Sequence, residues 1–205
     1  MKKKILVTLS VVACALLLVV GSVVGTLAYL TSKATVTNTF TVGKVAITLD
    51  ETEVNTDGTA KNNPATRAED GNEYHLLPGQ TYTKDPIVHV LKGSEECWVF
   101  VKVVNGLSAI ETTETGKTIA EQIVANGWTL YRQNGNESVY YKEGVNALSE
   151  QKNLDVFEKV TIAANVNNTT LATYADAKVV VTAYAVQSAG VTTVDAAWTA
   201  VKDLT

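Results

Sequence analysis

Two histidines, His75 and His89, are the only imidazole side chains in the sequence. Together with carboxylates, two histidines can hold a zinc ion. The HExxH spacing that places two imidazoles on one face of a helix is absent. His89 lies in an alternating segment, where a lone histidine is usually a core or rim residue of a strand, and His75 adjoins a turn. We therefore expect neither a metal site nor a bound cofactor.

The acidic residues between Asp50 and Gly58 form a second group of potential ion ligands. Calcium loops space their ligands regularly and close with a bidentate glutamate, and this stretch has neither feature. Its composition, like that of the polar stretch from Lys61 to Asn72, predicts a solvated loop. The sequence also has no serine nucleophile elbow, phosphate-binding glycine loop or CxxC pair. We expect no catalytic residues and predict that the protein is not an enzyme.

The N-terminal segment carries the signals of export. Lys2, Lys3 and Lys4 precede an uncharged, mostly apolar run from Ile5 to Ser32. Small residues at Thr26 and Ala28 occupy the two positions that a signal peptidase requires. We therefore predict a signal peptide over residues 1–28, with cleavage between Ala28 and Tyr29, and a secreted protein located in the extracellular matrix or at the cell surface.

Two alternatives to cleavage remain. The apolar run is long enough to span a bilayer, since about 20 residues suffice, so an uncleaved anchor is the first. Lipidation at Cys14 is the second, and it is disfavoured because it would leave the apolar residues 16–20 at the mature N-terminus. Each alternative places the C-terminal part outside the cell, because the lysines hold the other end in the cytoplasm.

Composition limits the partners of the exported part. Removing residues 1–28 leaves 177 residues with 14 basic and 21 acidic side chains, a net charge of −7. Such an acidic surface argues against a nucleic-acid partner. The length suits a single domain, residues 29–205, with a core of its own. Cys97 is the only remaining thiol, and its apolar strand predicts that it is buried and unpaired.

The first mature segment alternates. In residues 35–42, Val36, Phe40 and Val42 share one face and threonines the other. Val45, Ile47 and Leu49 continue the period of two after a slip at Gly43, where a bulge or bend is expected. β-Branched and aromatic residues favour strands here over helix.

The rest of the chain reads mainly as strands. The expected elements are a turn at 76–79, strands at 86–91, 97–104, 156–166 and 177–186, a hairpin at 128–141 around Asn134-Gly135, and helices at 117–127 and 194–201. In strand 97–104 both faces are apolar, which predicts a central position. The helix at 117–127 places Ile119, Ile123 and Val124 on one face. We therefore predict a mainly β chain, a β-sandwich of jelly-roll type with one or two short helices.

Several segments, in matching order over nearly the whole chain, resemble the TasA–camelysin family of Gram-positive bacteria. They are Leu27-Ala-Tyr-Leu-Thr31, Asn38-Thr-Phe-Thr-Val-Gly43, Val45-Ala-Ile-Thr-Leu-Asp-Glu51, Leu77-Pro-Gly-Gln-Thr-Tyr-Thr-Lys-Asp-Pro86, Glu96-Cys-Trp-Val-Phe-Val-Lys-Val103, Phe157-Glu-Lys-Val-Thr-Ile162 and Ala183-Tyr-Ala-Val-Gln187. The resemblance implies a jelly roll, processing by a SipW-type signal peptidase and assembly into extracellular fibres of the biofilm matrix.

Two function classes follow from this resemblance. The first is a structural fibre subunit whose partner is a second copy of itself, with a related minor or anchoring matrix subunit as a further partner. The second is a camelysin-like, metal-dependent peptidase at the cell surface, an activity that some family members are assigned. The missing zinc motif disfavours the peptidase for this chain.

Residues 29–42 are a candidate donor strand for the fibre subunit. Cleavage after Ala28 frees a strand-forming segment, and a detached strand can complete the sheet of a neighbouring molecule. In that case Val36, Phe40 and Val42 enter the neighbour. The alternative, equally supported by the sequence, is that the segment is the first strand of its own sheet. A covalently anchored pilin is disfavoured, because residues 200–205 contain no sorting motif, apolar tail or basic end.

Overall fold

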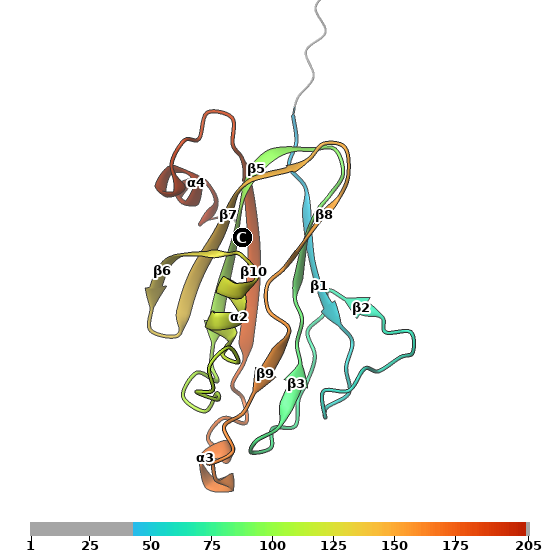
Figure 1. Cartoon of the computed structure of the whole chain (residues 1–205), viewed down its shortest axis with the longest axis vertical. Coiled ribbons are helices and arrows are strands. Elements are labelled where there is room, and N and C mark those ends of the chain that lie inside the picture. The colour runs from blue at the N-terminus through green and yellow to red at the C-terminus, as the bar shows by residue number, and fades with distance from the viewer. Residues whose placement is uncertain (1–42, 204–205) are drawn as a thin grey trace, which may run out of the picture. The chain divides into compact units, whose positions relative to one another are not determined.

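The structure, a computed structural model, describes residues 43–203. It is mainly β, and all of its strand pairs are antiparallel (Figure 1). One four-stranded sheet has the order β2-β1-β4-β8, formed by Arg67–Ala68, Ile47–Thr52, Ile87–Val90 and Lys152–Asp155. The other has the order β10-β5-β7-β6, formed by Val179–Gln187, Ser94–Asn105, Glu137–Ala147 and Thr129–Asn134.

A third, two-stranded sheet extends the first. It pairs β3, Thr81–Thr83, with β9, Lys159–Thr161, and these strands adjoin β4 and β8 in sequence. The Lys84 amide donates to the Glu158 carbonyl at 3.1 Å, and the Val156 amide donates to the Pro86 carbonyl at 3.0 Å. Proline has no N–H to donate, so the ladder is interrupted where Pro86 lies.

The main core lies between the two four-stranded sheets. Val99, Val101 and Val103 of β5 pack there with Val88 and Val90 of β4, and all five side chains are buried. β5 has a strand on each side, so the predicted central position of segment 97–104 is confirmed. Two facing antiparallel sheets that share one core are consistent with a β-sandwich.

A second, aromatic cluster covers the opposite face of β5. Trp98 and Phe100 pack there with Tyr184 of β10 and Trp198 of α4, Val194–Val201. The ring centroids of Phe100 and Trp198 are 5.3 Å apart. Thr193 caps α4 by accepting a hydrogen bond from the Ala196 amide at 3.2 Å. The sequence-based prediction of this helix, with Trp198 buried beneath it, is confirmed.

The remaining helices are short. α2, Ile119–Ala125, begins with a capping box between Thr118 and Glu121 and buries Ile119 and Ile123. The prediction that Val124 shares this face is wrong, because its side chain is 55% exposed. α3, Asn168–Ala172, was not expected, so the described residues contain three helices rather than one or two. Within residues 43–203, no helix combines the length and apolarity needed to cross a membrane.

Several local predictions are confirmed or corrected. Gly79 has a φ of 71°, and the Gln80 amide donates to the Leu77 carbonyl, as expected for the turn. The hairpin forms, but Asn134 pairs with Glu137, so Gly135 and Asn136 are the loop residues. Of these two loop residues only Gly135 has a positive φ, 59°, as in a type II′ turn. The stretch from residue 50, expected to be a loop, instead extends β1 and contains β2.

Candidate assembly edge

One edge of the second sheet has a long row of open backbone groups. The Gly106 amide donates to the Lys178 carbonyl at 2.9 Å, and the Ser188 amide donates to the Glu96 carbonyl at 2.8 Å. The even-numbered residues of β10 therefore bond to β5, and the odd-numbered residues 179–187 point their N–H and C=O groups away from it. Within residues 43–203 these outward groups have no hydrogen-bond partner. We call this row the β10 edge.

The β10 edge lacks the devices that usually block strand pairing. β10 has nine residues, none of them charged, and pairs with β5 without a register shift. By contrast, β6 carries Arg132 and a register shift between Leu130 and Arg132, and β8 carries Lys152 and Asp155. Charges and bulges on edge strands discourage pairing with another chain. An uncharged, regular edge strand of this length is therefore a template for strand addition.

The apolar side chains along this edge are only partly covered. Val179, Val181, Ala183 and Ala185 face the main core but stay partly exposed, whereas Val99 and Val101 on the neighbouring β5 are fully buried. On the facing sheet, Val45, Ile47 and Leu49 are also half-buried. β1 and β10 approach each other along this side, and no hydrogen bond joins them within the described residues. Another apolar strand would bury more of this surface.

The opposite side of the two sheets is closed by α2 and the residues after it. The Trp128 indole donates to the Asp155 carbonyl at 2.7 Å, and the Asn126 amide group donates to the Val156 carbonyl at 3.3 Å. The Gln122 side chain donates to the Lys159 carbonyl at 2.9 Å and accepts from the amides of Glu158 and Lys159 at 3.1 Å. Side chains thus occupy the edge formed by β8 and β9, in contrast to the β10 edge.

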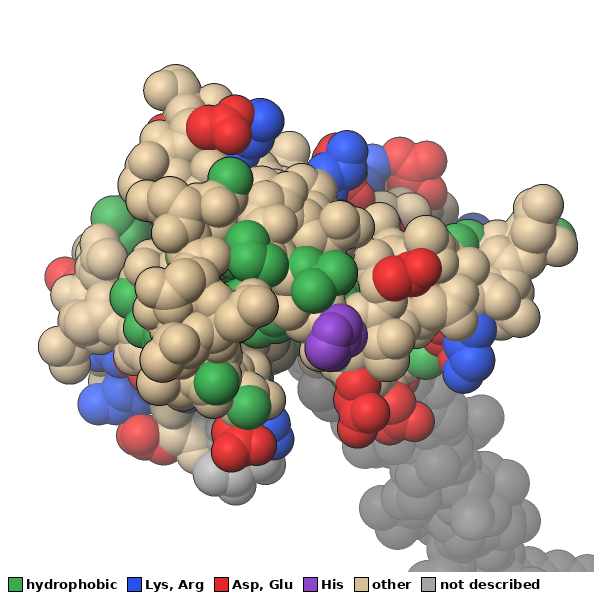
Figure 2. Space-filling view, turned by 90° about the horizontal axis from the view of Figure 1, so that it is seen from below, with side chains coloured by type: hydrophobic (Ala, Val, Ile, Leu, Met, Phe, Trp, Pro, Cys, Tyr) green, Lys and Arg blue, Asp and Glu red, His purple; other side chains and the backbone are tan. Residues whose placement is uncertain are grey.

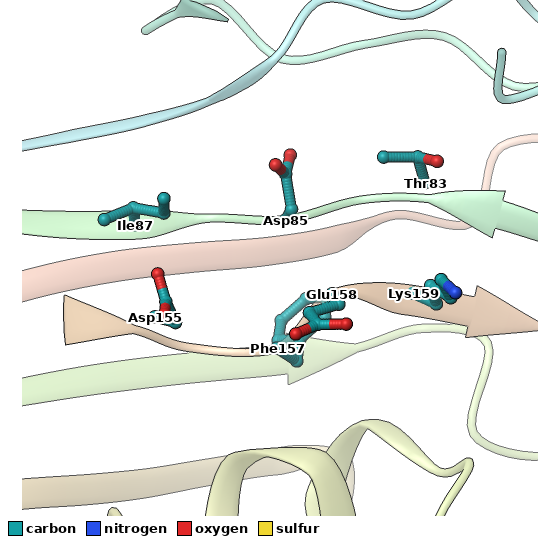
Figure 3. Close-up of a pocket in the computed structure, with 7 residues that line it drawn as sticks. All are labelled: Thr83, Asp85, Ile87, Asp155, Phe157, Glu158 and Lys159. Atoms are coloured by element: carbon teal, nitrogen blue, oxygen red, sulfur yellow. The ribbon is translucent and has the colours of Figure 1, made fainter. Parts of the chain in front are cut away.

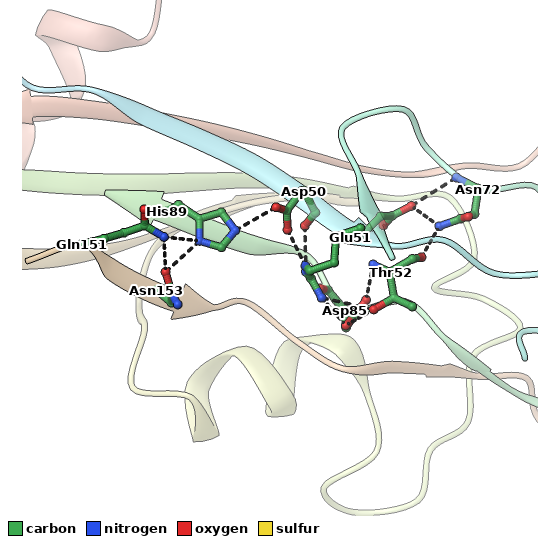
Figure 4. A network of polar contacts seen from close by, with 9 residues as sticks. Asp50, Glu51, Thr52, Asn72, Asp85, His89, Gln151 and Asn153 are labelled. Atoms are coloured by element: carbon green, nitrogen blue, oxygen red, sulfur yellow. Dashed lines mark hydrogen bonds and ion pairs between the residues drawn. The ribbon is translucent and has the colours of Figure 1, made fainter. Parts of the chain in front are cut away.

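A network of polar side chains lies along β1 and its neighbours in the first sheet (Figure 4). Arg67 contacts Asp50 at 2.6 Å and Asp85 at 2.7 Å, and Lys84 contacts Glu51 at 2.6 Å. Burial alone raises the pKa of Asp50, but hydrogen bonds from Arg67 and His89 outweigh it and hold that pKa below its ordinary value. These contacts fasten β2 to β1 and to the start of β4, so the network has a structural role.

His89 belongs to this network. Its Nε2 lies 2.9 Å from an Asp50 carboxylate oxygen, and its Nδ1 lies 2.8 Å from the Asn153 side-chain oxygen. His75 lies in the exposed segment before β3, where its carbonyl accepts a hydrogen bond from the Tyr82 hydroxyl at 2.7 Å. In the described part of the chain, no group of three or more His, Cys, Asp or Glu side chains is arranged to hold a metal ion.

A pocket of about 310 Å³ lies between the β4–β8 ladder and the β3–β9 ladder (Figure 3). Asp85, Asp155 and Glu158 line it together with Lys159. Asp85 is already bound to Arg67 and to the Thr52 amide and hydroxyl, and the other two acids are exposed. The arrangement offers no buried, preorganised ligand set.

Cys97 is fully buried in β5, as predicted. Its thiol lies 3.5 Å from the Val145 carbonyl. Burial, with a smaller contribution from the charge of Glu96, raises the pKa of this thiol to about 11. The protonated, enclosed thiol is unsuited to nucleophilic chemistry or to pairing between molecules.

The site residues predicted from the sequence, Ala28 and Tyr29 at the cleavage point and Val36, Phe40 and Val42 in the candidate donor strand, lie outside the described residues. The sequence-based prediction named a donor but missed the β10 edge. The signal was present as the uncharged run Val179–Gln187, but only the pairing pattern shows that this run lies at an edge.

Comparison with protein-family models, with curated proteins and with solved structures finds no match to the chain.

Proposed function

We propose that this protein is a secreted structural subunit of jelly-roll type that polymerises head to tail into extracellular fibres of the biofilm matrix. Residues 29–42 act as the donor strand. The observation that carries the proposal is the β10 edge, whose nine residues form an uncharged strand with open backbone groups and half-covered apolar side chains. The resemblance to the TasA–camelysin family supports the same function.

Polymerisation follows from where donor and acceptor lie in one chain. The donor segment precedes residue 43, whereas the acceptor edge belongs to β10, so each molecule offers a different surface to each neighbour. A contact between two different surfaces does not close on itself and propagates as a filament. Main-chain hydrogen bonds supply affinity, and alternate side chains supply register.

Processing controls when the donor becomes available. Cleavage after Ala28 by a SipW-type signal peptidase gives residue 29 a free end, which is needed for the segment to enter another molecule. The other partner is a related minor or anchoring matrix subunit that supplies the first donor or receives the last. The acidic mature chain disfavours nucleic acid as a partner.

The test follows purified mature protein, prepared as monomer, by electron microscopy over time. Three variants accompany it, a deletion of residues 29–42, Phe40→Asp, and Thr39→Asp as the matched control on the opposite face of the segment. Phe40→Asp places a charge where an apolar surface is expected and should cost several kcal/mol, on the order of 3–5, in whichever interface holds it.

A donor strand acting between molecules predicts that the deletion and Phe40→Asp abolish fibres while the thermal midpoint of the monomer hardly changes. Thr39→Asp should assemble nearly as well as the unmodified chain. If the segment is the first strand of its own sheet, the midpoint itself falls. Normal fibres and normal stability in Phe40→Asp would contradict both roles for this segment.

A further inference from the structure

We infer that the donor segment pairs with the β10 edge in antiparallel orientation, with residue 42 beside Val179 and residue 34 beside Gln187 of the receiving copy. This inference rests on the proposed function and adds to it the receiving strand, the strand polarity and the register. It follows from the described backbone of β1, β5 and β10 and from the length of the donor.

Length selects β10 over β1 as the receiving strand. The free edge of β1 ends where β2 pairs with Glu51 and Thr52, which leaves only residues 45–49 open. β10 offers nine residues without interruption. Residues 34–42 also number nine, and either segment spans about 30 Å at roughly 3.3 Å per residue. The nine residues 34–42 of the donor segment are therefore long enough to cover the β10 edge from end to end.

The faces match as well. On β10 the odd-numbered residues have outward backbone groups and side chains that face the core. In an antiparallel pair, residues that exchange both hydrogen bonds carry their side chains on the same face. Donor residues that exchange hydrogen bonds with β10 therefore also point their side chains toward the core. The even-numbered donor residues take these positions, because they include the apolar Val36, Phe40 and Val42. The threonines at positions 35, 37, 39 and 41 then face outward.

The direction of the donor strand relative to β10 follows from the position of residue 44, which comes just after the donor segment. The Glu95 amide donates to the Lys44 carbonyl at 2.9 Å, and the Ser188 amide donates to the Glu96 carbonyl at 2.8 Å. Residue 44 and the end of β10 thus both adjoin the start of β5, whereas β10 begins at the other end of the sheet, the end toward α3 (Figure 1).

That other end is where a donor would enter the next copy. It is seen face-on in Figure 2, where apolar side chains gather near the middle and most charged side chains lie toward the rim. In a stack of copies with one common orientation, the donor leaves one copy at the residue-44 end and enters the next at the Val179 end. Residue 42 then lies near Val179, which makes the pair antiparallel. A donor that folded back onto its own β10 would run parallel instead.

Adding a strand here also moves β1. Because β1 and β10 approach each other without a hydrogen bond between them, a new strand must separate them by about one strand spacing, roughly 4.8 Å. Only side-chain contacts are lost in that step, and the donor's apolar face replaces them.

Cysteine pairing tests the polarity directly. Val180 is 45% exposed on the outer face of β10, so Val180→Cys preserves the fold. Antiparallel pairing sets it opposite residue 41, and parallel pairing sets it opposite residue 35. A Val180→Cys copy is mixed with a Thr41→Cys copy or, as the matched control, with a Thr35→Cys copy. Fibres are then grown under mild oxidation and analysed as dimers on a non-reducing gel. Thr39→Cys with Thr182→Cys reports the same register at a second position.

The expected result is that Thr41→Cys cross-links to Val180→Cys at the donor–acceptor contacts that bring these two cysteines together, while Thr35→Cys remains at background. Fibres in which Thr35→Cys cross-links, or in which neither donor position does, overturn the inference and leave the proposed function standing. Absence of fibres from the unmodified mature chain overturns both. Because the two mixed copies carry one new cysteine each, a bond between those cysteines arises only between molecules.

Discussion

Gln122 provides a direct test of the idea that side chains close one side of the two sheets. Its amide makes three hydrogen bonds to the backbone of residues 158 and 159, at 2.9 to 3.1 Å, and another to the Lys117 carbonyl at 3.0 Å. Gln122→Leu removes these polar atoms at nearly constant size. Neutral hydrogen bonds contribute about 0.5–1.5 kcal/mol each, and water replaces part of them because Glu158 and Lys159 are exposed. We expect a loss of about 2 kcal/mol in the free energy of unfolding.

The measurement is thermal unfolding of the mature monomer by circular dichroism. A loss of that size lowers the midpoint by roughly 4–8 °C in a chain of this length. Val124→Ala, at an exposed position on the same helix, serves as control and should change the stability by less than about 0.5 kcal/mol. Fibre growth should be unaffected, because the cap lies on the side away from the β10 edge. An unchanged midpoint would refute the capping role of Gln122, and slower fibre growth at normal stability would refute the separation of the two sides.

Three further outcomes are expected. Cys97→Ser should assemble like the unmodified chain and lose about 1–3 kcal/mol in stability, because a buried hydroxyl replaces the thiol; fibres that dissolve in reductant would instead reveal a disulfide between subunits. The folded-state pKa of Asp50 is lowered from 3.8, so its stabilising contribution is present above that pH and is lost as the pH falls through the lower, folded-state value. The stability gap between the unmodified chain and Asp50→Asn, measured by urea denaturation, should therefore narrow below about pH 4, and a gap that is constant with pH would contradict the ion-pair account. Mass analysis of the exported protein should find Tyr29 at the N-terminus, and a secreted form that retains residues 1–28 would contradict the predicted cleavage.

Elements defined by local signals were predictable from the sequence. β5 was identified because valines alternate with Trp98 and Phe100, so both of its faces are apolar. The sequence carries a capping threonine, Thr193, just before α4, and apolar residues at helical spacing followed by Asn126-Gly127 at the end of α2, where Gly127 has a φ of 78°. In each case the information lies within about a dozen residues, as capping and alternation rules require.

Elements defined by distant partners were not predictable. β8, Lys152–Asp155, has a polar sequence and is a strand because β4 pairs with it. The hairpin loop shifted by one residue because Asn134-Gly135 and Gly135-Asn136 both suit primed turns, and the pairing of Asn134 with Glu137 decides between them. The β10 edge could not be predicted for the same reason. Whether a strand lies at an edge depends on how the whole sheet pairs and not on the sequence of that strand alone.

An open edge like that of β10 also allows a dimer that would compete with fibre growth. Two copies can pair β10 with β10 in antiparallel orientation, which uses the same surface on both molecules and closes into a two-fold dimer. Such a dimer buries both acceptors and stops growth, whereas the donor contact leaves one acceptor free at each step. Binding of the donor strand is more favourable than the β10–β10 dimer if the donor covers the half-exposed Val179 and Val181. A second β10 supplies only hydrogen bonds at the edge and cannot enter the space between the sheets. The apolar face of residues 34–42, rather than backbone pairing alone, therefore selects the growing fibre over the closed dimer.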